Sequence, residues 1–175
     1  AFSLAADSNG FEGYWSTKYG PMSLIRSGDR LEGHYVLGGA VAEIRGTVEH
    51  DRFVFQYEEP TAEGWGWFQL AADGRSFSGR WRPQDNAKWE EWTGQRAQEP
   101  NADDYAGLWM TNHGKMRLIA ARDRIEGIIG PGAETTIDGR LVCGRFLFRW
   151  RGPSESGDGW LQVSPAGRRL AGHQV

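Results

Sequence analysis

The chain has 175 residues, a formal net charge of −3 at pH 7, 25 Gly, nine Trp and one Cys. Its Arg residues are interleaved with Asp and Glu, so it lacks the basic surface of a nucleic-acid-binding protein, and we predict no nucleic-acid partner. The single cysteine excludes an internal disulfide and a multi-cysteine zinc site, and no stretch is apolar for long enough to span a membrane. Abundant Gly and Trp with few long apolar runs favour short, half-buried strands.

Residues 1–10 form a polar lead-in for which we predict little structure. The segment opens with AFSLAA. A small-x-small ending is typical of the tail of a signal peptide, but the same residues fit a boundary inside a longer protein. The compartment therefore stays open.

Residues 11–96 predict a first unit of about eight short strands. Apolar and polar residues alternate in runs such as GYWSTKY, RLEGHYV and RFVFQYE. Turn residues separate the runs, for example Gly28-Asp29, Gly38-Gly39 and Asp73-Gly74. Short connections favour antiparallel pairing of neighbouring strands, which is a meander.

The polar segment 97–104, AQEPNADD, predicts a linker, and residues 105–175 repeat the first unit. The segment FEGYWSTKYGPMSLIRSGDRLEG at 11–33 returns as YAGLWMTNHGKMRLIAARDRIEG at 105–127. The offset is 94 residues at Trp15 and Trp109 but 93 at Phe53 and Phe146, which indicates a one-residue deletion in the loop near Gly38. The repeat has no counterpart of KWEEWTGQR, so we predict seven strands and an exposed edge strand.

The fold class is therefore all-β, as two tandem antiparallel meander barrels of about eight and seven strands. One shared ring of fifteen or so strands is the alternative, and its lumen would be too wide for side chains to fill. The open edge of the second repeat could be covered by residues 1–10, by a second copy or by a further part of a parent protein. This predicts self-association or a parent-protein contact at that edge.

Comparison of the two repeats sorts scaffold positions from candidate binding positions. Residues kept in both copies, such as Trp15 and Trp67, fit a common core. Residues that differ within the shared frame are better candidates for binding. Tyr19 aligns with His113, and Tyr57 aligns with Trp150.

A second group of candidates follows the loop at residues 58–63. Trp65 aligns with Asp158, and alternation puts Trp65 and Trp67 on one face of their strand. We expect Tyr57, Trp65 and Trp67 to form an aromatic wall beside Glu58 and Glu63. Such a wall suits a sugar ring, a flat apolar ligand or a cation, although the two Trp could instead pack a core or an interface between units.

Catalytic and metal motifs are absent from the sequence. The four His have no ligand spacing, and no G-x-S-x-G, H-E-x-x-H or P-loop occurs, so we predict no metal and no cofactor. Glu90 and Glu91 are neighbours that would face opposite sides of a strand, which makes them a poor catalytic pair. Cys143 in LVCGRFLF reads as a small buried hydrophobic residue.

The pattern G-x-W at the first strand of each repeat resembles the calycin group, the lipocalins and avidins. It stands here as Gly13-Tyr14-Trp15 and Gly107-Leu108-Trp109, and the hairpin that follows resembles the opening of avidin-type barrels. The resemblance implies a closed or nearly closed barrel with ligands at its open end. It does not extend to a biotin-binding set, and each unit is shorter than a lipocalin or avidin.

Three classes of function remain open from the sequence. The first is a module that binds a small molecule or a glycan through Tyr19, Tyr57, Trp65, Trp67, His113 and Trp150. The second is a structural or protein-interaction domain of a larger protein. The third is an enzyme that uses a barrel cavity, such as a cyclase, isomerase or hydrolase, and it rests on analogy of fold with small bacterial barrels.

Overall fold

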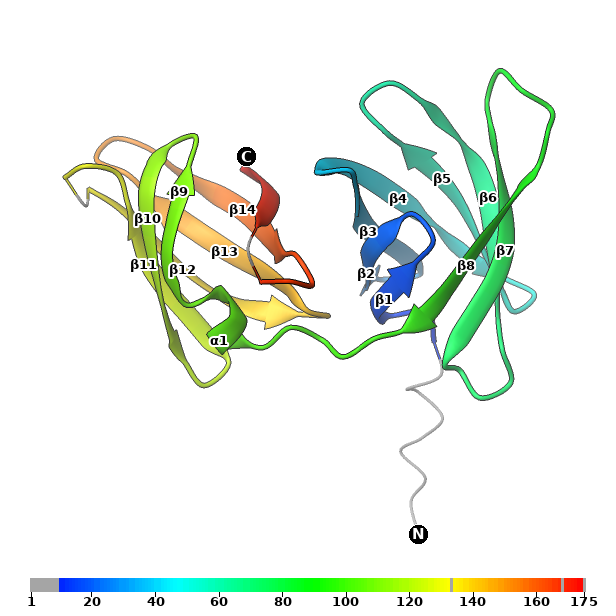
Figure 1. Ribbon diagram of the computed structural model, residues 1–175, viewed down its shortest axis with the longest axis horizontal. Helices are drawn as coiled ribbons and strands as arrows, with labels where there is room; N and C mark the ends of the chain where they lie inside the picture. The colour runs from blue at the N-terminus through cyan, green and yellow to red at the C-terminus, as the bar shows by residue number, and fades with distance from the viewer. Residues whose placement is uncertain (1–9, 133, 168, 175) are drawn as a thin grey trace, which may run out of the picture. The chain divides into compact units, whose positions relative to one another are not determined.

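The computed structural model describes residues 10–132, 134–167 and 169–174 (Figure 1). The chain divides into two compact units, Ala1–Gln98 and Glu99–Val175, which are described separately below. Apart from Gly10, the predicted lead-in lies outside the described residues. No helix in the described part of the chain is long and apolar enough to cross a membrane.

The first unit is a closed barrel of eight antiparallel strands in sequence order. The strands are β1 (Gly13–Thr17), β2 (Gly20–Ser27), β3 (Arg30–Leu37), β4 (Ala40–Glu49), β5 (Arg52–Glu58), β6 (Glu63–Leu70), β7 (Ser76–Pro83) and β8 (Glu90–Arg96). The ring closes because β1 pairs with β8, Trp15 opposite Arg96, as well as with β2. This confirms the predicted all-β meander and rules out one ring shared by both repeats.

Two-residue turns join several of the strands in the way that the sequence predicts. Gly28 has a φ of +66° in the turn between β2 and β3. His50 and Asp51 have φ values of +50° and +65° between β4 and β5, a left-handed conformation that short polar residues tolerate better than bulky ones. Cys143 differs from its prediction, because it lies half-buried in the turn between β12 and β13 with a φ of +50°.

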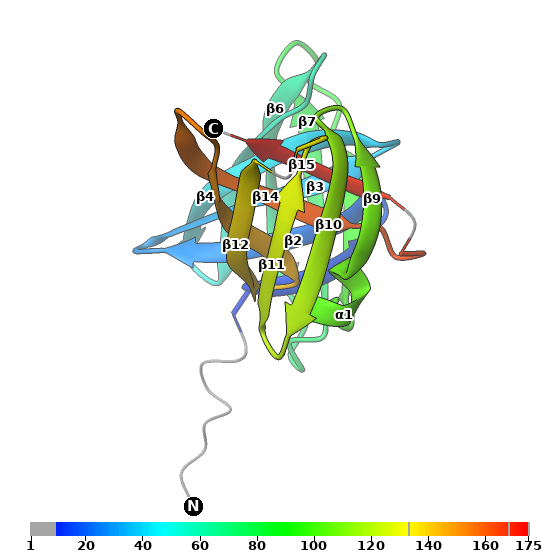
Figure 2. The same ribbon diagram turned by 90° about the vertical axis from the view of Figure 1, so that its left-hand side faces the viewer.

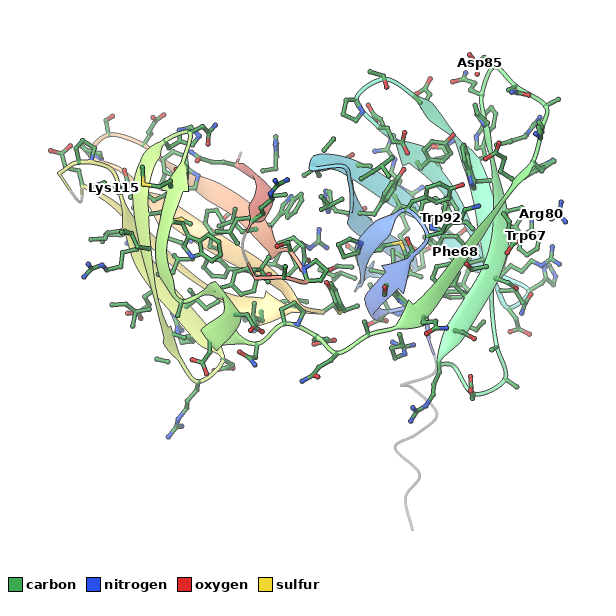
Figure 3. All side chains as sticks on the ribbon, in the orientation of Figure 1. Trp67, Phe68, Arg80, Asp85, Trp92 and Lys115 are labelled. Carbon is green, nitrogen blue, oxygen red and sulfur yellow. The ribbon has the colours of Figure 1, made fainter. Side chains whose placement is uncertain are left out.

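The interior of the first barrel is filled by aromatic rings. Alternation along each strand sends one set of side chains inward, and most of that set is less than 4% exposed. The members of this core are Phe11, Trp15, Met22, Leu24, Leu31, Tyr35, Ala42, Ile44, Phe53, Phe55, Tyr57, Phe68, Phe77 and Trp92. Trp67 was predicted to belong to it but faces outward, as Figure 3 shows beside the inward Phe68 and Trp92.

The second unit is a sheet of seven antiparallel strands with a short helix before it, and Figure 2 looks onto β9 to β12. Its elements are α1 (Ala102–Tyr105), β9 (Gly107–Thr111), β10 (Gly114–Ala121), β11 (Arg124–Ile129), β12 (Thr135–Val142), β13 (Arg145–Arg151), β14 (Ser156–Val163) and β15 (Leu170–Gln174). The count agrees with the predicted seven strands, and the sheet order runs from β15 to β9.

Helix α1 begins inside the predicted linker, residues 97–104, and ends at Tyr105, the first residue of the predicted second repeat. Asn101 caps it: its side chain accepts a hydrogen bond from the Asp104 amide, and the Asp104 carboxylate accepts one from the Asn101 amide. The helix ends in Tyr105, which is fully buried and whose hydroxyl donates to the Gly144 carbonyl at 2.8 Å. The helix therefore covers one end of the second sheet.

The two units share the local geometry around the repeated G-x-W. The Trp15 indole donates to the Phe11 carbonyl at 2.8 Å, and the Trp109 indole donates to the Tyr105 carbonyl at 2.7 Å. Burial differs, because Trp15 is fully buried while Trp109 is only half-buried. The difference follows from β8, which flanks β1 in the first unit.

Candidate functional site

Aromatic side chains from β5, β7 and the turn between β1 and β2 pack together at the mouth of the first barrel. Trp81 lies edge-on to both Tyr19 and Tyr57, with ring centroids 5.6 Å apart in each case. The Trp81 indole donates to the Tyr19 hydroxyl at 3.1 Å. Tyr19 and Tyr57, two predicted binding residues, are thus brought together in the mouth by Trp81, and Tyr57 also lines an open hollow.

Acidic groups surround the tyrosines of this mouth. The Tyr35 hydroxyl donates to Glu59 Oε1 at 2.7 Å, and burial together with this carboxylate raises the pKa of Tyr35 well above its ordinary value. Burial also raises the pKa of Tyr57 to about 12, and the charges of Glu59 and Asp85 add to the rise. The Tyr57 hydroxyl is buried and has no hydrogen-bond partner among the described residues.

Trp65 and Trp67 point away from this interior. Both lie on the outer face of β6, since the inward positions are taken by Gly64, Gly66 and Phe68. Aromatic rings from β5 occupy the space over these glycines: a Cβ on Gly64 would lie 2.6 Å from the Tyr57 hydroxyl. Tyr57 and Trp65 therefore project from opposite faces of the barrel wall, although both line one hollow together with Glu58 and Glu63, and Trp67 does not line it.

Trp67 behaves as a scaffold residue. The Arg52 guanidinium lies over its ring at 4.0 Å from the centroid. The second unit repeats the pair as Arg145 over Trp160 at 5.2 Å. A stack that both copies keep indicates a shared structural role for Trp67.

Trp65 has no such counterpart and lies 36% exposed beside an open hollow. The Arg82 guanidinium is 5.4 Å from the Trp65 ring centroid and 5.3 Å from that of Trp89, so it supports the Trp65 indole on one side. The hollow has a volume of about 220 Å³. Its lining comprises Glu43, Arg45, Gln56, Tyr57, Glu58, Glu63, Gly64, Trp65 and Gln84.

Three glutamates cross the floor of this hollow in a row. Glu43 lies directly opposite Glu58 on β5, and Glu58 lies directly opposite Glu63 on β6. Arg45 Nη1 is 3.7 Å from Glu43 and Arg45 Nη2 is 3.9 Å from Glu58. Three carboxylates against one guanidinium leave a formal charge of −2, and like charges directly opposite each other destabilise a sheet.

The loops at this end position the remaining polar groups. Glu59 N donates to the Ala62 carbonyl at 2.7 Å and closes the turn between β5 and β6. Gln84 N donates to the Glu63 carbonyl at 3.0 Å, which holds the start of the next loop beside the hollow. The hollow thus combines one exposed indole with carboxylate, amide and guanidinium groups.

The second unit has a hollow of a different kind, with a volume of about 290 Å³. Its lining combines apolar side chains with polar ones. It is lined by Thr111, Asn112, His113, Met116, Ile129, Ile137, Phe148, Trp160, Leu161, Gly172, His173 and Gln174. The predicted residue His113 lines this hollow, whereas Trp150 is buried in the core of the same unit.

The sequence analysis missed most of the polar residues around Trp65. Glu43 and Arg45 lie on β4, Gln56 lies on β5, and Gln84 follows β7. A signal was nevertheless present in the repeat, because Glu43, Arg45 and Gln56 align with Thr136, Asp138 and Arg149. Every one of these positions differs between the two copies.

No known protein family, curated protein or solved structure matches this chain. Within residues 10–132, 134–167 and 169–174, no group of three or more His, Cys, Asp or Glu side chains is placed to hold a metal ion.

Proposed function

We propose that the first unit binds a glycan in the hollow beside Trp65. The observation that carries the proposal is an exposed indole in the wall of an open, polar hollow whose other lining residues, apart from Gly64, are not kept in the second copy. Positions that serve only the barrel are kept, such as Trp67 under Arg52. The groups around Trp65 are therefore candidates for recognition rather than for folding.

The chemistry of the hollow matches that of a sugar ring. One face of a pyranose carries C–H groups and packs on an aromatic ring, while hydroxyl groups project from its edge. Carboxylates accept hydrogen bonds, and the amides of Gln56 and Gln84 both donate and accept. Arg45 offers further donors, so the hydroxyl groups of a sugar ring stacked on Trp65 would find both donors and acceptors in the hollow.

The closed interior supports this outer site over an internal one. Trp92, Phe68 and Phe55 fill the first barrel, so a ligand or a substrate for a cavity enzyme would have to displace aromatic rings that are at most 2% exposed. An exposed Trp on the outer face needs no such rearrangement. The calycin resemblance enters this proposal only as an expectation about the barrel, because the proposed ligand lies outside it.

A small cationic amine is the second candidate ligand. The formal charge of −2 around the hollow favours it, and an aromatic ring also attracts a cation. The two ligands differ in their response to salt, since attraction of a cation is screened while stacking of a neutral sugar is not.

The test is tryptophan fluorescence of the full chain against a panel of neutral oligosaccharides and polyamines. We expect saturable binding of an oligosaccharide, and at least about tenfold weaker binding by Trp65→Ala, since each 1.4 kcal/mol of lost contact is tenfold. Trp89→Ala is the matched control, because Trp89 is also exposed and stacks on Arg82 but does not line the hollow. Binding that Trp65→Ala leaves unchanged, or loss of binding in both variants alike, would refute the site.

A further inference from the structure

The second sheet has two edges where the first barrel has a closed wall. In the part of the chain that the structure describes, β9 pairs only with β10, and β15 pairs only with β14. The corresponding strands of the first unit, β1 and β7, both pair with β8. The second unit therefore has an opening between β15 and β9, called the slot below, and His113 next to β9 and Gly172 of β15 line one hollow.

The hollow of the second unit is the place that Trp92 occupies in the first. The Trp92 ring lies edge-on to four aromatic rings, with centroids 5.0 to 5.7 Å away. Those rings belong to Tyr19, Tyr35, Phe55 and Phe68. Their counterparts in the repeat are His113, Ile129, Phe148 and Leu161, and all four line the hollow.

Backbone groups along the slot match those that hold β8. In the first unit Lys18 N donates to the Thr93 carbonyl at 3.1 Å, and Ala97 N donates to the Tyr14 carbonyl at 3.0 Å. The counterparts of Lys18 and Tyr14 are Asn112 and Leu108, at the edge strand β9. Alternation along an antiparallel strand turns the amide of Met110, between them, to the same side.

Backbone groups also alternate in direction along β15, the strand at the opposite edge of the slot. Ser164 N donates to the Arg169 carbonyl at 2.8 Å, so the backbone groups of Arg169 face β14. Those of Leu170 and Gly172 then face the slot. Gly172 is the counterpart of Gly79, which lies opposite Trp92 in the first barrel.

We propose that this slot binds an extended peptide with the pattern aromatic-x-Gly, which adds as the eighth antiparallel strand. The aromatic ring fills the hollow opposite Gly172, and the glycine lies beside Leu170, as Gly94 lies beside Phe77. An Arg two residues after the glycine covers the half-buried Trp109, as Arg96 lies over Trp15 at 4.3 Å from the ring centroid. Strand addition of this kind takes affinity from main-chain hydrogen bonds and specificity from side-chain pockets.

The probe is a labelled peptide with the sequence of residues 89–97, WEEWTGQRA, added to the full chain and followed by fluorescence anisotropy. We expect saturable binding, and at least about tenfold weaker binding when the residue at the Trp92 position of the peptide is Ala. That variant changes only the peptide, so a failure of the protein to fold cannot explain its effect.

The matched pair of protein variants is Met110→Pro and Met110→Thr. The Met110 side chain is 75% exposed, and proline is tolerated at an edge strand while it removes the slot-facing amide. We expect Met110→Pro to lose peptide binding and Met110→Thr to keep it, with equal melting temperatures.

Two outcomes would overturn the proposal. Absence of peptide binding to a monomeric chain would mean that the slot does not accept a strand. A dimer that Met110→Pro dissociates would assign the slot to a second copy of this chain instead of a peptide partner.

Discussion

The two buried tryptophans of the first barrel, Trp15 and Trp92, differ in the hydrogen bonding of their indole nitrogens. Trp15 and Trp92 are at most 2% exposed, and both contribute a ring to the core. The Trp15 indole donates to the Phe11 carbonyl at 2.8 Å, whereas the Trp92 indole nitrogen has no hydrogen-bond partner among the described residues. Replacement of each by Phe therefore removes a similar amount of apolar contact but has opposite consequences for hydrogen bonding.

The magnitudes follow from this difference. Loss of the smaller ring of an indole costs about 1–3 kcal/mol in a packed core. Trp92→Phe also removes a buried unpaired donor, which stabilises the protein by about 1–3 kcal/mol, so the net change should lie within about 2 kcal/mol of zero. Trp15→Phe leaves the Phe11 carbonyl without its indole donor, at a further cost of about 1–3 kcal/mol, and should cost about 2–6 kcal/mol in all.

The free energy of unfolding of the first unit is measured by hydrogen exchange of the backbone amides in β7 and β8. These amides report on the first unit separately from the second. A difference of about 2 kcal/mol between the variants corresponds to about a 30-fold difference in the opening equilibrium. If Trp92→Phe costs as much as Trp15→Phe, the unpaired indole is not a source of strain and the reasoning fails.

Two further substitutions test the ends of the same barrel. Arg96→Ala should lower the free energy of denaturant unfolding by about 2–4 kcal/mol. The Arg96 guanidinium donates to the carbonyls of Gly10, Glu12 and Gly74 at 2.8, 2.7 and 3.1 Å, respectively. Full stability of Arg96→Lys would contradict this explanation, because an ammonium group cannot make these three hydrogen bonds in the same geometry. The raised pKa of Tyr57, about 12, means that its neutral hydroxyl is favoured in the folded state. The contribution of this hydroxyl to folding stability is fully present below pH 10 and falls by about 1.4 kcal/mol per pH unit up to pH 12. The Tyr57→Phe variant should therefore lose less stability than the wild type between pH 10 and pH 12. Equal losses in the two proteins would contradict the assignment.

The architecture could be predicted from the sequence because the repeat supplies an internal comparison. Trp15 and Trp109 set the register of two copies, and turn residues such as Gly28-Asp29 mark the hairpins. The helix at Ala102–Tyr105 was missed although Asn101 and Asp104 have the spacing of a capping box. A helix of four residues carries no hydrophobic period, so only its cap could have revealed it.

The candidate site could be predicted only in part, because the register of neighbouring strands decides which of their residues lie on the same face of the sheet. Alternation placed Trp65 and Trp67 together, which the structure has. The position of Tyr57 depended on the length of the turn before β6, and with Glu58 opposite Glu63, Trp65 falls opposite Gln56. One residue more or less in that turn would have put Tyr57 and Trp65 on the same face.

The two copies depart from their common plan in complementary ways. The first keeps Trp92 inside and so has no room there, and its unshared residues gather on the outer wall around Trp65. The second keeps the stacked pair of Arg145 and Trp160 but has a hollow that Trp160 and His113 line. Substitutions at Trp65 and at Met110 should therefore act independently, since each lies in a different compact unit. A chain that binds one ligand with both units together would break this independence, and a double variant measured against both probes would detect it.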